Sequence, residues 1–169
     1  MKAMTKLLIG TGSIVSAVGV ALGTPVIGLI APLLAVGNQS VDLHARGTAE
    51  TSTGEPFRVK LETEGPATVS IQDFSYAGST ATQASQNGWH SHPGVVVVTL
   101  ISGSIRWYDE NCEPTDYKAG DSWVEGSQLH AFRVTSLTPV HGIAAFVTAH
   151  GKALRTDETA PGCAVGLGL

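Results

Sequence analysis

Alternation of apolar and polar residues predicts β-strands through most of the chain from Phe57 onward. The run 57–62 alternates apolar with charged side chains, and the run 67–74 does so with small polar ones. Gly, Pro, Asp or Asn separate further runs at 95–101, 104–108, 117–124, 129–134 and 140–150. Ser102-Gly103, between two such runs, predicts a hairpin. Short strands at this spacing indicate an all-β sandwich or barrel.

The N-terminal pattern is different, because Lys2 and Lys6 are the only charged residues before Asp42. A basic start, a long apolar middle and small residues near the end are typical of an export signal. The run is also long enough to span a bilayer as a hydrophobic helix. We therefore expect residues 1–37 to be a cleaved signal peptide or an uncleaved membrane anchor. Both alternatives place the rest of the chain outside the cytoplasm.

Residues 38–55 are rich in Ser, Thr, Gly and Glu and show no apolar period, so we expect a flexible linker there. The folded domain then covers residues 56–169. Cys112 and Cys163 are the two cysteines of the chain. In an exported domain, two isolated cysteines most simply form one disulfide, although two free thiols stay an alternative.

The chain carries 10 basic and 14 acidic residues, and two of the basic ones lie in the apolar N-terminal run. The remaining part is therefore acidic and has no run rich in Lys or Arg. A binding site for nucleic acid is excluded on electrostatic grounds.

Three histidines are the candidate chemistry of the domain. His90 and His92 lie two residues apart at the start of an apolar strand, so their side chains should share one face. His130, in a later strand, can complete a set of three imidazole ligands. We expect them to hold one divalent metal ion. Imidazole binds Fe, Mn, Zn, Ni and Cu, so the identity of the metal stays open.

The same alternation predicts what surrounds the metal. Val96 and Phe132 should face the interior as apolar walls, and Gln128, two residues before His130, should reach a bound ligand. His141 and His150 have opposite parity in the last strand, so we expect them at the surface. Glu125 lies in the turn before His130, where we expect it to be solvated.

The order of these features resembles the cupin superfamily over residues 57–150. The first cupin motif matches Gly88, His90-Ser91-His92 and Gly103, and the second matches the stretch from Gly120 to His130. Val96 stands where many cupins carry a glutamate ligand, and Gly126 stands where a proline is expected. The asparagine that should follow His130 is also absent. The resemblance implies a small β-barrel with a three-histidine site that lacks the acidic ligand.

This resemblance leaves three functions open. The first is a metal-dependent dioxygenase or isomerase acting on a small molecule outside the cytoplasm. The second is a non-catalytic module of the cell envelope that binds a metal or a small ligand. The third is a structural barrel that needs no metal. A homodimer is also expected, from the resemblance alone.

Overall fold

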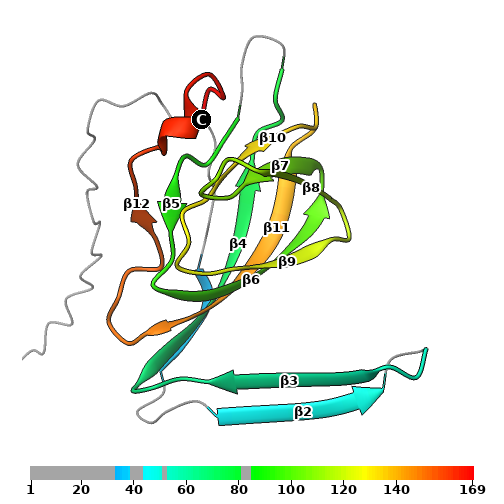
Figure 1. The fold of residues 1–169 in the computed structure, drawn as a ribbon, viewed down its shortest axis with the longest axis vertical. Helices are drawn as coiled ribbons and strands as arrows, with labels where there is room; N and C mark the ends of the chain where they lie inside the picture. Colours follow the sequence, from blue (N-terminus) through cyan, green and yellow to red (C-terminus); the bar gives the residue numbers. More distant parts are fainter. Residues whose placement is uncertain (1–32, 39–43, 51–52, 81–84) are drawn as a thin grey trace, which may run out of the picture.

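The computed structural model describes residues 33–38, 44–50, 53–80 and 85–169, and it is all-β, as the pattern predicted. Two sheets face each other and form a barrel (Figure 1). The larger sheet is antiparallel, with the spatial order β1 (Leu33–Asn38), β4 (Ala67–Tyr76), β11 (Val140–Ala149), β6 (Gly94–Ser102) and β9 (Ser122–Glu125). The smaller sheet has the order β10 (Ala131–Val134), β7 (Ser104–Tyr108) and β8 (Pro114–Lys118).

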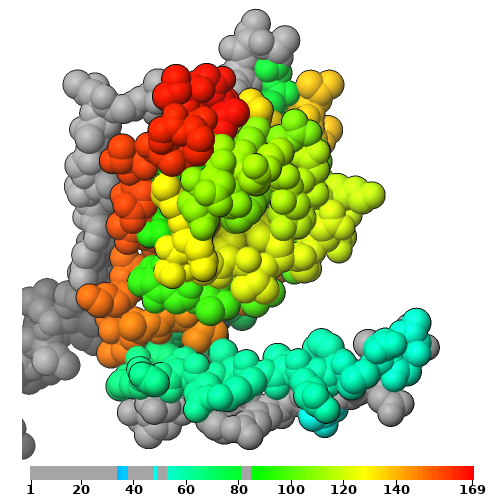
Figure 2. All heavy atoms as spheres, in the orientation of Figure 1, coloured from blue at the N-terminus to red at the C-terminus, as the bar shows by residue number. Residues whose placement is uncertain are grey.

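Two further strand pairs complete the described structure. The short strands β5 (His90–Ser91) and β12 (Thr156–Asp157) pair beside the barrel, and a 3-10 turn follows at Gly162–Ala164. A hairpin of β2 (His44–Glu50) and β3 (Pro56–Glu62) extends away from the barrel (Figures 1 and 2).

The structure describes only part of the N-terminal region for which the sequence predicts a signal or anchor and a linker. The expected signal peptide or anchor helix falls on residues 1–32, which lie outside the described residues. Strand β1 occupies the last part of the expected anchor, and β2 lies within the expected linker 38–55, where it pairs with β3. Within the described part of the chain, no helix is long and apolar enough to cross a membrane.

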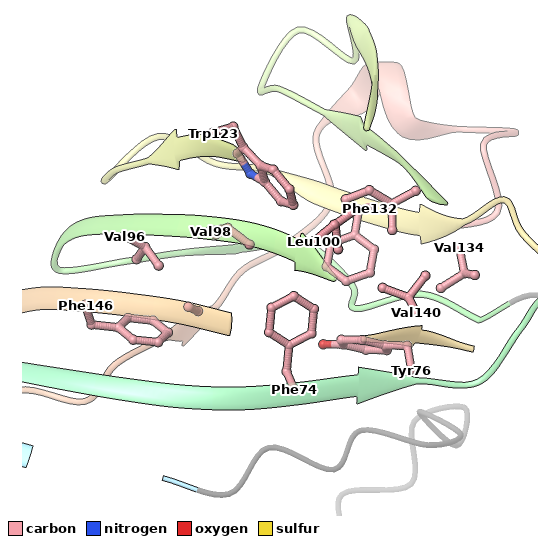
Figure 3. Close-up of a cluster of buried hydrophobic side chains, with 12 residues drawn as sticks. Phe74, Tyr76, Val96, Val98, Leu100, Trp123, Phe132, Val134, Val140 and Phe146 are labelled. Atoms are coloured by element: carbon pink, nitrogen blue, oxygen red, sulfur yellow. The ribbon is translucent and has the colours of Figure 1, made fainter. Parts of the chain in front are cut away.

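The core lies between the two sheets, and the two-residue period of β6 shows how the sequence fills it. Val96, Val98 and Leu100 are buried, whereas their neighbours Val95 and Val97 face solvent. Figure 3 shows aromatic side chains from β4, β9 and β10 meeting these residues in the barrel interior. Full burial of one such aliphatic side chain stabilises the fold by roughly 1.5–3 kcal/mol, so the core fixes which face of each strand points inward.

The expected hairpin at Ser102-Gly103 is wrong. Strand β6 pairs with β11 and β9, whereas β7 pairs with β10 and β8, so the turn is a corner between two sheets. Gly103 has a φ of 78°, and a Cβ there would lie 2.7 Å from Val140 Cγ2. Glycine is required at this corner by both its backbone conformation and its close packing.

The predicted disulfide joins Cys112 to Cys163, with their Cα atoms 6.1 Å apart. It fastens the C-terminal segment to the loop that follows β7. Beside it, Ala164 is buried in a small cluster that includes Trp89 and Tyr108. The C-terminal segment is therefore held against β5, the strand that carries His90, and residues 154–157 lie next to the histidines.

Candidate metal centre

The structure brings the three predicted histidines together. His90 lies in β5, His92 follows that strand, and His130 directly precedes β10. The backbone N–H groups of His90 and His130 each donate to the other's carbonyl at 2.9 Å, which locks the two segments side by side. The ring centroids of the three imidazoles are 4.3 to 5.1 Å apart, and all three residues are buried.

Each imidazole is oriented by a hydrogen bond to the backbone. Nδ1 of His90 donates to the carbonyl of Gly88 at 2.9 Å, and Nδ1 of His130 donates to that of Gln128 at 2.8 Å. Nδ1 of His92 donates to the carbonyl of Leu154 at 2.7 Å. A carbonyl oxygen only accepts, so Nδ1 carries the proton and Nε2 of the neutral ring keeps its lone pair. This is the state in which histidine binds a metal.

The fourth member of the site is Glu125, which the sequence reasoning missed. Its Oε2 lies 3.3 Å from His92 Nε2 and 3.4 Å from His130 Nε2, and its side chain is 7% exposed. The expectation that Glu125 is solvated is therefore wrong, and so is the expectation of a site without a carboxylate. One ligand atom from each of the four residues lies within 4.8 Å of all the others.

The pairing of β9 with β6 explains how Glu125 enters the site. Glu125 lies directly opposite Val96, and Trp123 lies directly opposite Val98. Paired residues project to the same face of a sheet, so Glu125 points inward with Val96. One signal in the sequence could have found it: Glu125 is two residues after the large apolar Trp123, which marks the buried face, and it lies one position beyond the predicted strand 117–124.

Two indole groups hold the Glu125 carboxylate in place. Trp107 Nε1 donates to Oε1 at 3.0 Å, and Trp123 Nε1 donates to the same oxygen at 2.9 Å. Because both indoles use Oε1, Oε2 faces the histidines. Burial raises the pKa of Glu125, but the adjacent imidazoles of His130 and His92, together with the hydrogen bond from Trp123, outweigh it and bring the pKa well below its usual range. Glu125 is therefore ionised at neutral pH.

Burial also determines the charge of His90. Desolvation lowers its pKa from 6.5 to about 3, and the positive charge of Arg155 acts in the same direction. His90 is therefore a neutral imidazole at any physiological pH.

The donor set fits a divalent metal ion. Nε2 of His92 and Nε2 of His130 are fully buried and have no hydrogen-bond partner among the described residues, which is costly for a polar atom unless something binds it. Three imidazole nitrogens and one carboxylate oxygen are ligands that Fe, Mn, Zn, Ni and Cu all accept. The side chains of the site do not distinguish among these metals.

A cavity of about 210 Å³ adjoins the four residues, and His90, His92 and Glu125 line part of it. Val96 and Phe132 form part of its apolar wall, where the alternation placed them. Gln128 does not reach it: the chain bends between β9 and β10, so strand alternation does not apply, and its side chain is exposed on a separate surface hollow. Its contribution to the site is the carbonyl that orients His130.

Comparison with known proteins finds no matching family model and no matching curated relative. Among solved structures, the chain is similar to a protein with a double-stranded β-helix domain from Klebsiella pneumoniae. The two are 23% identical with a TM-score of 0.44, over 54% of this chain and 76% of the other. A cupin-like protein from Thermotoga maritima is 14% identical with a TM-score of 0.44, over 57% and 79% of the two chains.

A third similar structure is an oxalate oxidase, 13% identical with a TM-score of 0.43 over 53% of this chain and 45% of the other. At these identities the likeness concerns the fold alone.

Proposed function

We propose that this protein holds one divalent metal ion through His90, His92, His130 and Glu125, and binds a small molecule in the adjoining cavity. The observation that carries the proposal is the convergence of three oriented imidazoles and one ionised carboxylate on a single point. Two of the converging nitrogens are buried without a partner, which favours a bound cation over an empty cluster.

In such a site, different residues of the chain orient the metal ligands and form the cavity wall. The backbone carbonyls fix the imidazoles, the indoles of Trp107 and Trp123 fix the carboxylate, and Phe74, Phe132 and Phe146 keep the cavity apolar. A bound metal would supply Lewis acidity, or a binding position for an oxygen atom of a substrate or of O2. Dioxygenation and isomerisation of a small molecule are the reactions that we propose first, following the resemblance of the motifs.

Glu125 changes the charge of the proposed site. Three neutral imidazoles would leave a divalent ion with a net charge of +2, and the carboxylate reduces this to +1. The reduced charge favours ligands with a single negative charge over dianions. The presence of Glu125 also removes one argument for a non-catalytic module, which is that the site would lack a carboxylate.

The non-catalytic alternative remains the second candidate, and one observation favours it. Tyr76 is the phenol that lines the cavity, and burial raises its pKa to about 12, so it is a poor proton acceptor at neutral pH. Measuring O2 consumption and product formation with a panel of phenols, diketones and thiols separates the two. Binding without turnover in the metal-loaded protein would favour the module.

Elemental analysis of the purified full chain tests the metal itself. We expect one metal ion per chain in the wild type and its loss in His92→Ala. His141→Ala is the matched control, because His141 pairs with Asp73 at 2.8 Å instead of joining the site. A wild type that stays metal-free after exposure to all five candidate metals would overturn the proposal.

We also propose that the domain lies outside the cytoplasm. The disulfide supports this, since such bonds persist mainly in oxidising compartments. Fractionation of cells expressing the full chain, with protease added to intact cells, tests the location. Recovery of the chain in the cytoplasmic fraction with both thiols reduced would contradict it.

A further inference from the structure

Arg155 is the one cationic side chain among the described residues that line the cavity. It comes from the segment between β11 and β12, two residues before the strand pair that Asp157 makes with His90. Its positive charge acts on both His90 and Tyr76, so it lies near both the metal site and the phenol. The rest of the wall is mostly aromatic and aliphatic, so Arg155 adds a positive charge to a largely apolar cavity.

The guanidinium of Arg155 is held in position by two hydrogen bonds and keeps donor capacity for a ligand. Nη2 donates to the carbonyl of Asn87 at 2.6 Å, and Nε donates to Asp157 at 2.6 Å. Nη1 makes no hydrogen bond with the described residues, and the side chain is 32% exposed. Asp157 is 82% exposed, so solvent screens its charge and Arg155 stays electrostatically positive toward the cavity.

Tyr76 offers a second donor on the wall of the same cavity. Its side chain is buried in the cavity wall, packed edge-on against Phe132 with ring centroids 4.9 Å apart (Figure 3). Its hydroxyl makes no hydrogen bond with the part of the chain that the structure describes. Because the phenol keeps its proton at neutral pH, it can donate to an anionic oxygen.

From this arrangement we infer that Arg155 and Tyr76 bind the carboxylate of a small monocarboxylic acid, whose apolar body fills the cavity toward the metal site. The inference rests on the proposed function and specifies its ligand class. A cavity of about 210 Å³ is smaller than the roughly 300–1,000 Å³ of sites for drug-sized molecules. The acid must therefore be short, with a body that packs against Phe74, Phe132 and Phe146.

The charges around the cavity favour one carboxylate over other anions. A phosphate dianion needs more donors than one free guanidinium nitrogen and one hydroxyl, and its second charge would be buried unpaired among aromatic rings. A neutral ligand would leave Arg155 without an anionic partner inside the cavity. A monoanion provides that partner with one carboxylate and brings no second charge to bury.

Calorimetry on the metal-loaded full chain tests the inference with three acids and their amides as probes: acetate and acetamide, isobutyrate and isobutyramide, benzoate and benzamide. We expect at least one acid to bind about tenfold or more tightly than its amide. Arg155→Gln should abolish that preference, and Tyr76→Phe should reduce it. Arg106→Gln is the matched control, because Arg106 forms an exposed pair with Asp116 on β7 and β8, away from the cavity lining.

Each outcome of this experiment decides one claim. Equal binding of acids and amides by the wild type, or a preference that survives Arg155→Gln, would overturn the role of Arg155. The role of Arg155 would also be overturned if none of the three acids bound. Metal content is measured on the same samples, so a chain without metal counts against the proposed function. A chain with metal but no carboxylate preference counts against this inference alone.

Discussion

Glu125 lies directly across the β6–β9 pair from Val96, and both side chains point into the barrel. Val96 is the position at which the cupin motif would place its glutamate. In this chain the carboxylate comes instead from the neighbouring strand, at the residue paired with Val96. Residues paired in this way have Cβ atoms about 4.5–5.5 Å apart, a distance that a glutamate side chain can bridge.

This relationship predicts the result of a swap. Glu125→Val should weaken metal binding by about 10-fold or more, because it removes the anionic ligand, and it leaves the indoles of Trp107 and Trp123 without their acceptor. Adding Val96→Glu should restore part of the affinity, since the new carboxylate starts from the paired position on the same face. Competition with a chromogenic chelator measures both variants. Glu125→Gln serves as a control of similar size, and wild-type affinity in Glu125→Val would show that the carboxylate is not a ligand.

The two indoles that hold Glu125 make a second prediction. Trp123→Phe and Trp107→Phe keep an aromatic ring but remove the donor to Oε1, so each should lower metal affinity by about 10–100-fold. Trp89→Phe is the matched control, because the Nε1 atom of Trp89 has no hydrogen-bond partner. Chelator competition, with melting temperatures recorded in parallel, separates a lost positioning contact from a lost fold. Equal affinities for all three variants would contradict the role of the indoles.

Most residues of this site follow from the local sequence pattern, but Glu125 does not. The spacing of His90 and His92 and the later His130 follow from strand periodicity, as do the buried positions of Val96 and Phe132. Glu125 is not assigned in this way, because the predicted strand ends at Val124 and leaves Glu125 in a turn, whereas its position in the site depends on the β6–β9 register. Pairing between distant strands is a tertiary property that one strand's pattern does not contain.

The assignment of Gln128 failed for a related reason. Alternation was extended from His130 back through a bend, and a two-residue period holds only while the backbone is extended. Strand β10 begins at Ala131, so Gln128 lies outside any strand and its side chain is exposed.

The disulfide was predictable because the chain has only two cysteines. The role of residues 154–157 in the cavity wall was not, because it depends on where that disulfide places the C-terminal segment.

The lowered pKa of His90 predicts acid sensitivity in the metal-free protein. Between about pH 3 and pH 6.5 the unfolded chain binds a proton at His90 and the folded chain does not. The free energy of unfolding should therefore fall as the pH is lowered through this window, by up to about 1.4 kcal/mol per pH unit from this residue. Urea unfolding from about pH 7 to pH 5 measures the slope, above the range in which Glu125 titrates. His90→Gln should flatten it, and an unchanged slope would argue against a buried neutral imidazole.

The disulfide should stabilise both the fold and the site. It closes a loop with a sequence separation of 51, which corresponds to about 4 kcal/mol in the chain-entropy model. Removing it with Cys112→Ser and Cys163→Ser should lower the free energy of unfolding by up to that amount. It should also weaken metal binding, because the segment it holds includes the Leu154 carbonyl that orients His92. Urea unfolding and chelator competition measure the two effects, and wild-type values for both would contradict this coupling.

The most direct test is a crystal structure of the metal-loaded full chain, with anomalous diffraction data collected at the absorption edge of the bound metal. We predict one anomalous peak per chain, within bonding distance of Nε2 of His90, His92 and His130 and of a carboxylate oxygen of Glu125. A peak bound elsewhere, or no peak at these four side chains after loading, would contradict the metal centre and the function built on it.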